Sequence, residues 1–239
     1  MTTLLEWAIS GHGGKERWDA ISRFQAVLSM SGAIWNLKET PGLFEHVTVC
    51  GETRDQRVTI TPFPAPGKYA TWEPHRETIE TTDGIVVAER AEPASLFNGH
   101  TRQTPWDTLH AAYFAAEANW NYFVAPFIFA RPDFATEEIE PWNENGEIWR
   151  SLRVTYPNSI AAHTKQQTHY FDNAGLLRRI DYSVDILGGC RAVHYPSSYR
   201  EFDGIMVPIR RQVFVRNPDG AAARGAVSIA IDVNHVVFT

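Results

Sequence analysis

The fold is decided by residues 104–126, which read TPWDTLHAAYFAAEANWNYFVAP. Thr104 is a favourable N-cap residue, Pro105 stands where the first turn of a helix accepts proline, and Asp107 adds negative charge to that turn. Pro126 then prevents the helix from continuing. The segment therefore predicts one long helix that begins at Thr104 and ends just before Pro126.

One face of this helix carries large and polar side chains. At about 100° per residue, a narrow stripe collects Trp106, His110, Tyr113, Glu117, Trp120 and Val124. The opposite side carries small residues that let another backbone approach closely, namely Ala111, Ala112, Ala115, Ala116 and Ala118. Because such a helix can line a ligand cavity, Trp106 and Trp120 are candidate ligand-binding residues.

Three polar members of the stripe, His110, Tyr113 and Glu117, are candidate catalytic residues. Consecutive members lie about one turn apart and are neighbours on the helix. In an apolar pocket the histidine and the carboxylate can act as base and acid, and Tyr113 can donate to a developing enolate or carbonyl oxygen. The alternative is an aromatic core stripe in which His110 and Glu117 are simply satisfied polar groups.

Outside this helix the chain reads as a succession of strands. Two short helices open it, over residues 3–10 and 15–21, the first with a capping box between Thr3 and Glu6. Strand-like runs precede the long helix at 24–37, 43–50, 57–62, 68–72, 77–81 and 85–90. Further runs follow it at 137–142, 148–156, 166–171, 176–186, 191–195, 205–215 and 226–238. Short turns such as Asp83-Gly84 and Asn145-Gly146 make adjacent strands antiparallel.

We therefore expect an α+β fold with a single large, curved, antiparallel sheet, a half-barrel, that wraps the long central helix. No linker divides the chain, so one domain over residues 1–239 is expected. Its parts are short N-terminal helices in 1–22, a first sheet half in 23–91, a central helical insert in 104–130 and a second sheet half in 135–239.

Alternation assigns an apolar face to the later strands and places Tyr182 on it. Three polar residues interrupt that face: Arg178, Arg211 and His235. An inward charge is costly unless it is paired. Either these arginines anchor a carboxylate or another anion in a cavity, or they pair internally with Glu117, or they lie solvated at strand ends. Tyr182, Arg178, Arg211 and His235 are accordingly candidate ligand-binding residues.

Composition excludes several classes of function. The net charge of −6 argues against nucleic acid and against an anionic membrane surface as partners. No apolar run has the length of about 18 residues that a membrane-spanning helix needs. The N-terminus does not read as a signal peptide, and the two cysteines, Cys50 and Cys190, suit reduced thiols, so a cytoplasmic protein is expected. No motif for a metal, a cofactor or a serine nucleophile is found, and none is expected.

Three further features carry a family resemblance. These are the opening helix with Gly13-Gly14 and Trp18, the helical insert after Ala94, and the hairpin sequence YFDNAGL at 170–176. In this layout the chain resembles the half-barrel of the LolA/LppX-type lipoprotein and lipid carriers. The resemblance implies a hydrophobic pocket between sheet and helix. The chain departs from that family in showing no export signal.

Together these features predict a protein that binds a hydrophobic small molecule, with an acidic group such as a carboxylic acid held near Arg178 or Arg211. The alternative is a cofactor-independent enzyme, a cyclase, isomerase or hydrolase, that uses the acid and base residues of the central helix. A third interpretation is a structural module whose central helix is plain core. The oligomeric state is left open.

Overall fold

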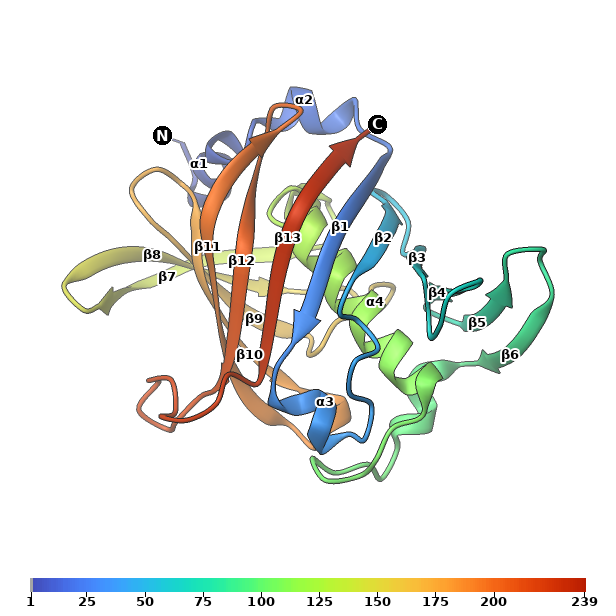
Figure 1. The fold of residues 1–239 in the computed structure, drawn as a ribbon. Helices are drawn as coiled ribbons and strands as arrows, with labels where there is room; N and C mark the ends of the chain where they lie inside the picture. Colours follow the sequence, from blue (N-terminus) through green and yellow to red (C-terminus); the bar gives the residue numbers. More distant parts are fainter. Residues whose placement is uncertain (1) are drawn as a thin grey trace.

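Thirteen antiparallel strands form one open, curved sheet in the computed structural model, which describes residues 2–239 (Figure 1). The strands before the central helix are β1 Arg23–Ser31, β2 Val47–Glu52, β3 Val58–Thr61, β4 Lys68–Glu73, β5 Arg76–Thr81 and β6 Val86–Ala91. Those after it are β7 Ala135–Glu144, β8 Glu147–Thr155, β9 Gln166–Phe171, β10 Leu177–Val184, β11 Cys190–Phe202, β12 Ile205–Val215 and β13 Ile229–Phe238. The predicted fold class is confirmed.

The sheet consists of two meanders joined at their ends. Its strand order is β6-β5-β4-β3-β2-β1-β13-β12-β11-β10-β9-β8-β7, so successive strands are neighbours within each half. The join is the pairing of β1 with β13, in which Phe24 lies opposite Phe238. The edges of the sheet are β6 and β7, and the chain passes from one edge to the other through the central helix.

The central helix, α4, spans Thr108–Val124 and lies inside the curve of the sheet (Figure 1). Its N-cap is Asp107, whose carboxylate accepts from the backbone N–H of His110 at 2.8 Å. The predicted start at Thr104 is therefore wrong by three to four residues. The reason is tertiary, because the N–H of Trp106 donates to the carbonyl of Lys38 at 2.9 Å and holds the preceding segment extended. The helix ends before Pro126, as predicted.

Three short helices cover the two ends of the sheet. α1 (Leu4–Gly11) and α2 (Lys15–Asp19) lie at the end marked by both chain termini in Figure 1, and α1 begins with the predicted capping box. α3 (Ala33–Leu37) lies at the opposite end, where the sequence predicted continued strand. Three 3₁₀ turns complete the elements: η1 Pro93–Phe97, η2 Phe127–Ala130 and η3 Asp185–Leu187.

The strand before α3 ends at Gly32 because the backbone changes direction there. Gly32 has a φ of 120°, and a Cβ at this position would lie 2.5 Å from the carbonyl oxygen of Ser228. The N–H groups of Ala33 and Ile34 then donate to the carbonyls of Val227 and Ser228 instead of to a neighbouring strand. α3 consequently lies against the mouth of the half-barrel.

Two β-bulges alter the faces that alternation predicted. In β10 the register with β9 shifts between Leu177 and Arg179, and in the β1–β13 pair it shifts between Val27 and Leu28. One extra residue puts the side chains on its two sides out of phase. In β10 Leu177 is buried in place of Arg178 while Tyr182 keeps its predicted face, and in β13 Val236 is buried in place of Val237. Within residues 2–239, no helix is both long enough and apolar enough to cross a lipid bilayer.

Candidate functional site

An apolar cavity of about 450 Å³ lies between α3, α4 and strands β10 to β13. We call it the main cavity. Its walls are mostly aliphatic and include Ile34, Leu37, Val184, Leu187, Val213 and Ile229. The side chains of Phe114, His163 and Tyr182 also line it, from α4, the β8–β9 loop and β10. A volume of this size matches pockets that enclose small organic molecules.

Two arginines, Arg102 and Arg191, contribute to the lining of this cavity and are exposed. Within residues 2–239, neither forms an ion pair with a carboxylate. Lys38 is near Arg102, and burial together with the Arg102 charge lowers its pKa to about 8. The exposed side of the cavity therefore has positive charge in a protein whose net charge is negative.

The loop between β8 and β9 places His163 beside the cavity. Gln56 holds this loop at Ala161 through two hydrogen bonds of 2.8 Å. Its Nε2 donates to the Ala161 carbonyl, and its Oε1 accepts from the Ala161 N–H. Asn121 on α4 also donates to that carbonyl at 3.0 Å. The carbonyl of His163 itself accepts from the N–H of Asp185. The loop is thus fixed on both sides of the histidine.

Glu117 is the buried partner of His163. Its Oε2 lies 2.6 Å from Nδ1 of His163, and its Oε1 accepts from Nδ2 of Asn121 at 3.1 Å. The imidazole ring is stacked on Phe114, with ring centres 5.2 Å apart and planes at 16°. Tyr182 packs on the ring with its centre also 5.2 Å away. The predicted internal ion pair of Glu117 with an arginine is therefore replaced by a pair with histidine.

Arg211 lies inside the half-barrel, on the face that alternation predicted. Its Nη2 donates to the Tyr122 carbonyl at 3.0 Å, and the guanidinium carbon is 4.9 Å from the centre of the Tyr122 ring. Its Nη1 is buried and has no hydrogen-bond partner among the described residues. Arg211 and Glu117 line a common small cavity of about 10 Å³, enough for about one water molecule.

The same interior contains buried histidines and tyrosines. Burial lowers the pKa of His12 to about 4 and that of His169 to about 3, and it lowers the pKa of His194 well below its usual value. Burial raises the pKa of Tyr122 to about 12 and that of Tyr182 well above 10. These histidines are neutral and these phenols are protonated at ordinary pH.

The three predicted catalytic residues do not meet at one point. His110 lies in the first turn of α4, where its Nδ1 is 2.9 Å from Asp107, and burial is the main cause that lowers its pKa. Tyr113 packs against Trp72, and burial raises its pKa. Of the three, Glu117 alone has its side chain at ion-pair distance from a residue that lines the main cavity, His163, which the sequence did not single out as its partner.

The two tryptophans predicted to bind ligand have structural contacts instead. Trp106 packs on Phe114 and lies 4.8 Å below the Lys38 ammonium group. Trp120 is fully buried, and its Nε1 donates to the carbonyls of Glu52 and Asp55 at 2.7 and 3.0 Å. Neither lines the main cavity, and of the nine predicted site residues, all of them described, Tyr182 alone does so.

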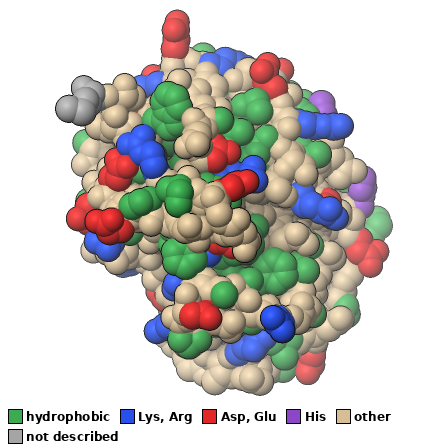
Figure 2. Space-filling view, turned by 90° about the vertical axis from the view of Figure 1, so that its left-hand side faces the viewer, with side chains coloured by type: hydrophobic (Ala, Val, Ile, Leu, Met, Phe, Trp, Pro, Cys, Tyr) green, Lys and Arg blue, Asp and Glu red, His purple; other side chains and the backbone are tan. Residues whose placement is uncertain are grey.

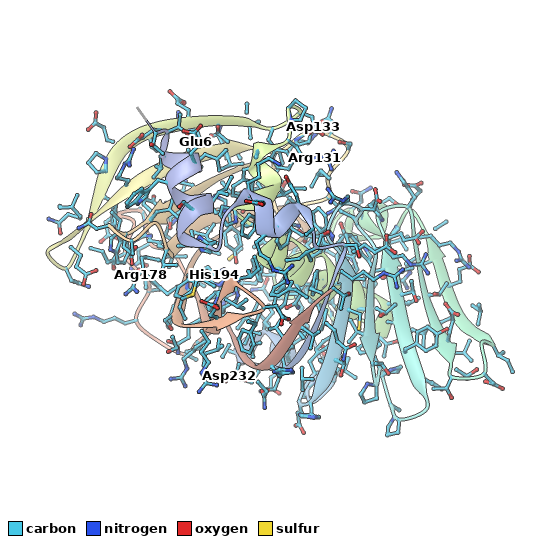
Figure 3. The ribbon with its side chains drawn as sticks, turned by 90° about the horizontal axis from the view of Figure 1, so that it is seen from above. Glu6, Arg131, Asp133, Arg178, His194 and Asp232 are labelled. Atoms are coloured by element: carbon cyan, nitrogen blue, oxygen red, sulfur yellow. The ribbon has the colours of Figure 1, made fainter. Side chains whose placement is uncertain are left out.

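Arg178 and His235 lie outside the interior, so the predicted faces of both are wrong. The bulge in β10 turns Arg178 outward, where it is partly exposed and 3.9 Å from Asp172. Figure 3 places Arg178 toward the periphery of the molecule and the buried His194 further in. The bulge in β13 likewise leaves His235 exposed, with its ring against Phe202.

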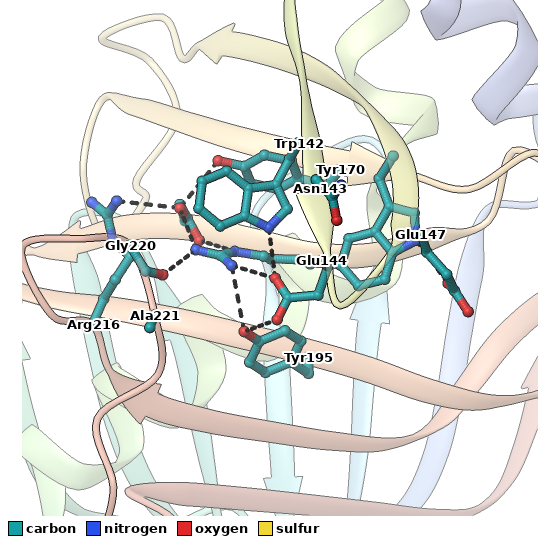
Figure 4. Close-up of polar contacts among 12 residues, drawn as sticks. Trp142, Asn143, Glu144, Glu147, Tyr170, Tyr195, Arg216, Gly220 and Ala221 are labelled. Carbon is teal, nitrogen blue, oxygen red and sulfur yellow. Dashed lines mark hydrogen bonds and ion pairs between the residues drawn. The ribbon is translucent and has the colours of Figure 1, made fainter.

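Arg179, the residue after Arg178 in β10, is fully buried, and Figure 4 shows Trp142, Glu144 and Gly220 around it. Its guanidinium donates to both oxygens of Asp181 at 2.7 and 3.0 Å, to Glu144 at 2.6 Å and to the Gly220 carbonyl at 2.5 Å. The Trp142 ring covers it at 4.5 Å. We call these residues the Arg179 network. Alternation had predicted that Arg179 and Asp181 face water.

The surface shows mixed charge around scattered hydrophobic side chains. Figure 2 shows acidic and basic groups interspersed over one face of the molecule. Among the described residues, no group of three or more His, Cys, Asp or Glu side chains is placed to hold a metal ion. The main cavity combines a volume of about 450 Å³ with a mostly apolar lining and is the candidate ligand site.

Comparison with known proteins finds relatives by structure alone. No family model and no curated protein sequence matches the chain. A LolA superfamily protein from Nitrosomonas europaea is similar with a TM-score of 0.52 and 9% identity, over 99% of this chain and 92% of that one. A DUF1329 family protein from Desulfovibrio piger gives a TM-score of 0.51 and 11% identity, over 98% and 91% of the two chains.

A third similar structure is a domain described as an outer membrane lipoprotein-sorting protein from Vibrio parahaemolyticus. Its TM-score is 0.53 at 11% identity, over 98% of this chain and 92% of that one. At such identities the likeness concerns the fold alone. It confirms the resemblance on which the prediction of a half-barrel rested. The chain therefore has a LolA-like half-barrel fold.

Proposed function

We propose that the protein binds a hydrophobic small molecule with an acidic group in the main cavity. The observation that carries this proposal is the apolar space of about 450 Å³ between α3, α4 and the sheet. Burying an alkyl chain there contributes about 0.8 kcal/mol per methylene group. The lipoprotein-sorting description of the Vibrio structure supports a hydrophobic ligand in general, because the two chains share the fold along nearly their whole length.

The acidic group is assigned to Arg102 and Arg191. Both line the cavity and lack a carboxylate partner among the described residues, whereas Arg178 lies outside it and Arg211 lines only small cavities deeper in the interior. A carboxylate at the exposed side of the cavity stays partly hydrated and still gains from two nearby cations. Its alkyl chain then extends toward Tyr182.

The proposal is tested by binding of decanoate and decanol, measured by displacement of a fluorescent naphthalene sulfonate dye. Ala33 is exposed and lines the cavity, so Ala33→Trp is expected to obstruct it and to weaken both ligands at least tenfold. Ala91→Trp, on the edge strand β6, is the matched control and should change neither affinity. Equal affinities in the wild type and Ala33→Trp would exclude this cavity.

The assignment of the acidic group has its own test. Arg102→Gln and Arg191→Gln should each weaken decanoate by up to about fivefold, or about 1 kcal/mol, because both side chains are exposed. The affinity for decanol should stay the same. If both ligands weaken equally in both variants, the arginines do not recognise the carboxylate.

A further inference from the structure

We infer that the main cavity is also a site of proton transfer, in which His163 removes a proton from the carbon next to the carbonyl group of a hydrophobic ketone. His163 is the catalytic residue and Glu117 the positioning residue. This inference rests on the proposed binding function and adds a reaction to it. It replaces the predicted assembly of His110, Tyr113 and Glu117, whose members do not meet.

The orientation of the His163 ring is determined by its surroundings. Gln56 and Asn121 hold the loop at Ala161, and Phe114 and Tyr182 pack on the ring. A base must be held in one geometry if it is to act on a bound substrate. The stacking and the fixed loop meet that requirement without the substrate.

The two ring nitrogens of His163 have different environments. Nδ1 is buried and lies 2.6 Å from Glu117 Oε2, an ion-pair distance at an angle outside that of a hydrogen bond. Nε2 is accessible and accepts no hydrogen bond from a described residue, and His163 lines both the main cavity and the small cavity shared with Glu117. Because Nδ1 is occupied by Glu117, we assign Nε2 to the main cavity. A carboxylate beside Nδ1 favours the tautomer with the proton on that atom. Nε2 then has a free lone pair directed at the ligand.

A buried cation lies near the pair. Arg211 lines the same small cavity as Glu117 and His163, within the part of the chain described here. A carboxyl group 2.6 Å from one nitrogen of an imidazole is the arrangement of a general base with its orienting group.

A hydrogen-bond donor for the carbonyl oxygen lies next to the base. The hydroxyl of Tyr182, which lines the cavity, is 3.1 Å from that of Tyr122. The two groups have two hydrogens and need one of them for their mutual hydrogen bond. When Tyr122 donates to Tyr182, the hydroxyl of Tyr182 can donate to the oxygen of a bound ketone.

The step itself needs no further reactant. The C–H bond next to the carbonyl breaks, its proton moves to Nε2 of His163, and its electron pair forms the C=C bond of an enolate whose oxygen accepts from Tyr182. Return of a proton to the same carbon exchanges its hydrogen with the solvent. In a β,γ-unsaturated ketone, return to the γ carbon moves the double bond into conjugation.

The test uses 2-decanone in D₂O, with exchange of its α hydrogens followed by NMR and its binding measured by dye displacement. We expect the wild type to accelerate exchange. His163→Gln should lower the rate by about 10²- to 10⁴-fold while 2-decanone still binds within about tenfold of wild type. His194→Gln is the matched control, since His194 is buried outside the main cavity, and its rate should stay within about twofold of wild type.

Glu117→Gln separates positioning from structure. If Glu117 orients the base, this variant lowers the exchange rate at unchanged affinity, and ¹⁵N shifts of the His163 ring lose the Nδ1–H pattern that we expect in the wild type. Should either variant fail to fold, Ala33→Trp still applies, because it obstructs the cavity and must abolish exchange with the His163–Glu117 pair intact.

The outcomes distinguish the two proposals. Binding of 2-decanone without accelerated exchange, or exchange that persists in His163→Gln, overturns the proton-transfer inference and leaves the binding function standing. Failure of decanoate, decanol and 2-decanone to bind overturns the binding function and the inference with it.

Discussion

Replacing Arg179 by methionine tests the buried network on the outer face of the sheet. Arg179 is 0% exposed, and its guanidinium makes charged hydrogen bonds to Asp181 and Glu144. Methionine retains much of the side-chain length but leaves these carboxylates without their cation. Breaking a buried ion pair in this way costs about 3–5 kcal/mol, because the remaining charge stays desolvated.

The expected loss lies at the lower end of that range. Asp181 keeps a second cation, Arg216 at 3.2 Å, and the Tyr170 hydroxyl at 3.1 Å. The Glu144 side chain is 20% exposed and can regain part of its hydration. We therefore expect Arg179→Met to lower the free energy of unfolding by about 3 kcal/mol.

The preceding residue supplies a matched control. The Arg178 side chain is 36% exposed and lies 3.9 Å from Asp172, so Arg178→Met should cost at most about 1 kcal/mol. Urea unfolding followed by tryptophan fluorescence measures both losses, and equal m-values show that they are differences in stability. If Arg178→Met is as destabilising as Arg179→Met, the bulge in β10 does not place these two residues as described.

Three further predictions concern pH and backbone geometry. Burial lowers the pKa of His169 to about 3. The stability that comes from keeping this histidine neutral is complete above about pH 6.5 and is lost as the pH falls toward 3. His169→Gln should therefore reduce the slope of unfolding free energy against pH below 6.5 by up to about 1.4 kcal/mol per pH unit. Burial raises the pKa of Glu77 to about 8, so native Glu77 holds its proton and the stability of the protein falls as the pH rises from about 4.5 to 8. The stability of Glu77→Gln relative to wild type should therefore be higher at pH 9 than at pH 5. Gly32→Ala brings a Cβ to 2.5 Å from the Ser228 carbonyl oxygen, whereas Gly84 has a positive φ but open space around it. Gly32→Ala should therefore lower the melting temperature more than Gly84→Ala, by the equivalent of about 1–3 kcal/mol of stability. Equal melting temperatures for the two alanine variants would show that the contact at Ser228 is not close.

The main elements were predictable because their signals are local. Pro126 stops the central helix whatever surrounds it, and Asp-Gly and Asn-Gly turns make neighbouring strands antiparallel. β9 and β12 have the predicted bounds. Arg211 lies on the predicted face because no register shift interrupts its pairing with β11 or β13.

The candidate site was less predictable because its residues are brought together by distant contacts. His163 is positioned by Gln56, whose hydrogen bonds to Ala161 span 105 residues of sequence. Its partner Glu117 was identified as a functional candidate, but the sequence offered no local spacing that joins the two. Arg102 and Arg191 lie in separate segments, and only the folded chain places both beside one cavity.

The sequence by itself determined the central helix, the two meanders and their antiparallel pairing, because each depends on residues close together in the chain. The tertiary structure decided that Arg179 is buried, because Glu144, Trp142 and Gly220 reach it from distant segments, and a bulge in the pairing of β9 with β10 turns Arg178 outward. It also decided that Glu117 contacts a histidine, because the curvature of the sheet around α4 brings Nδ1 of His163 to 2.6 Å from Oε2 of Glu117.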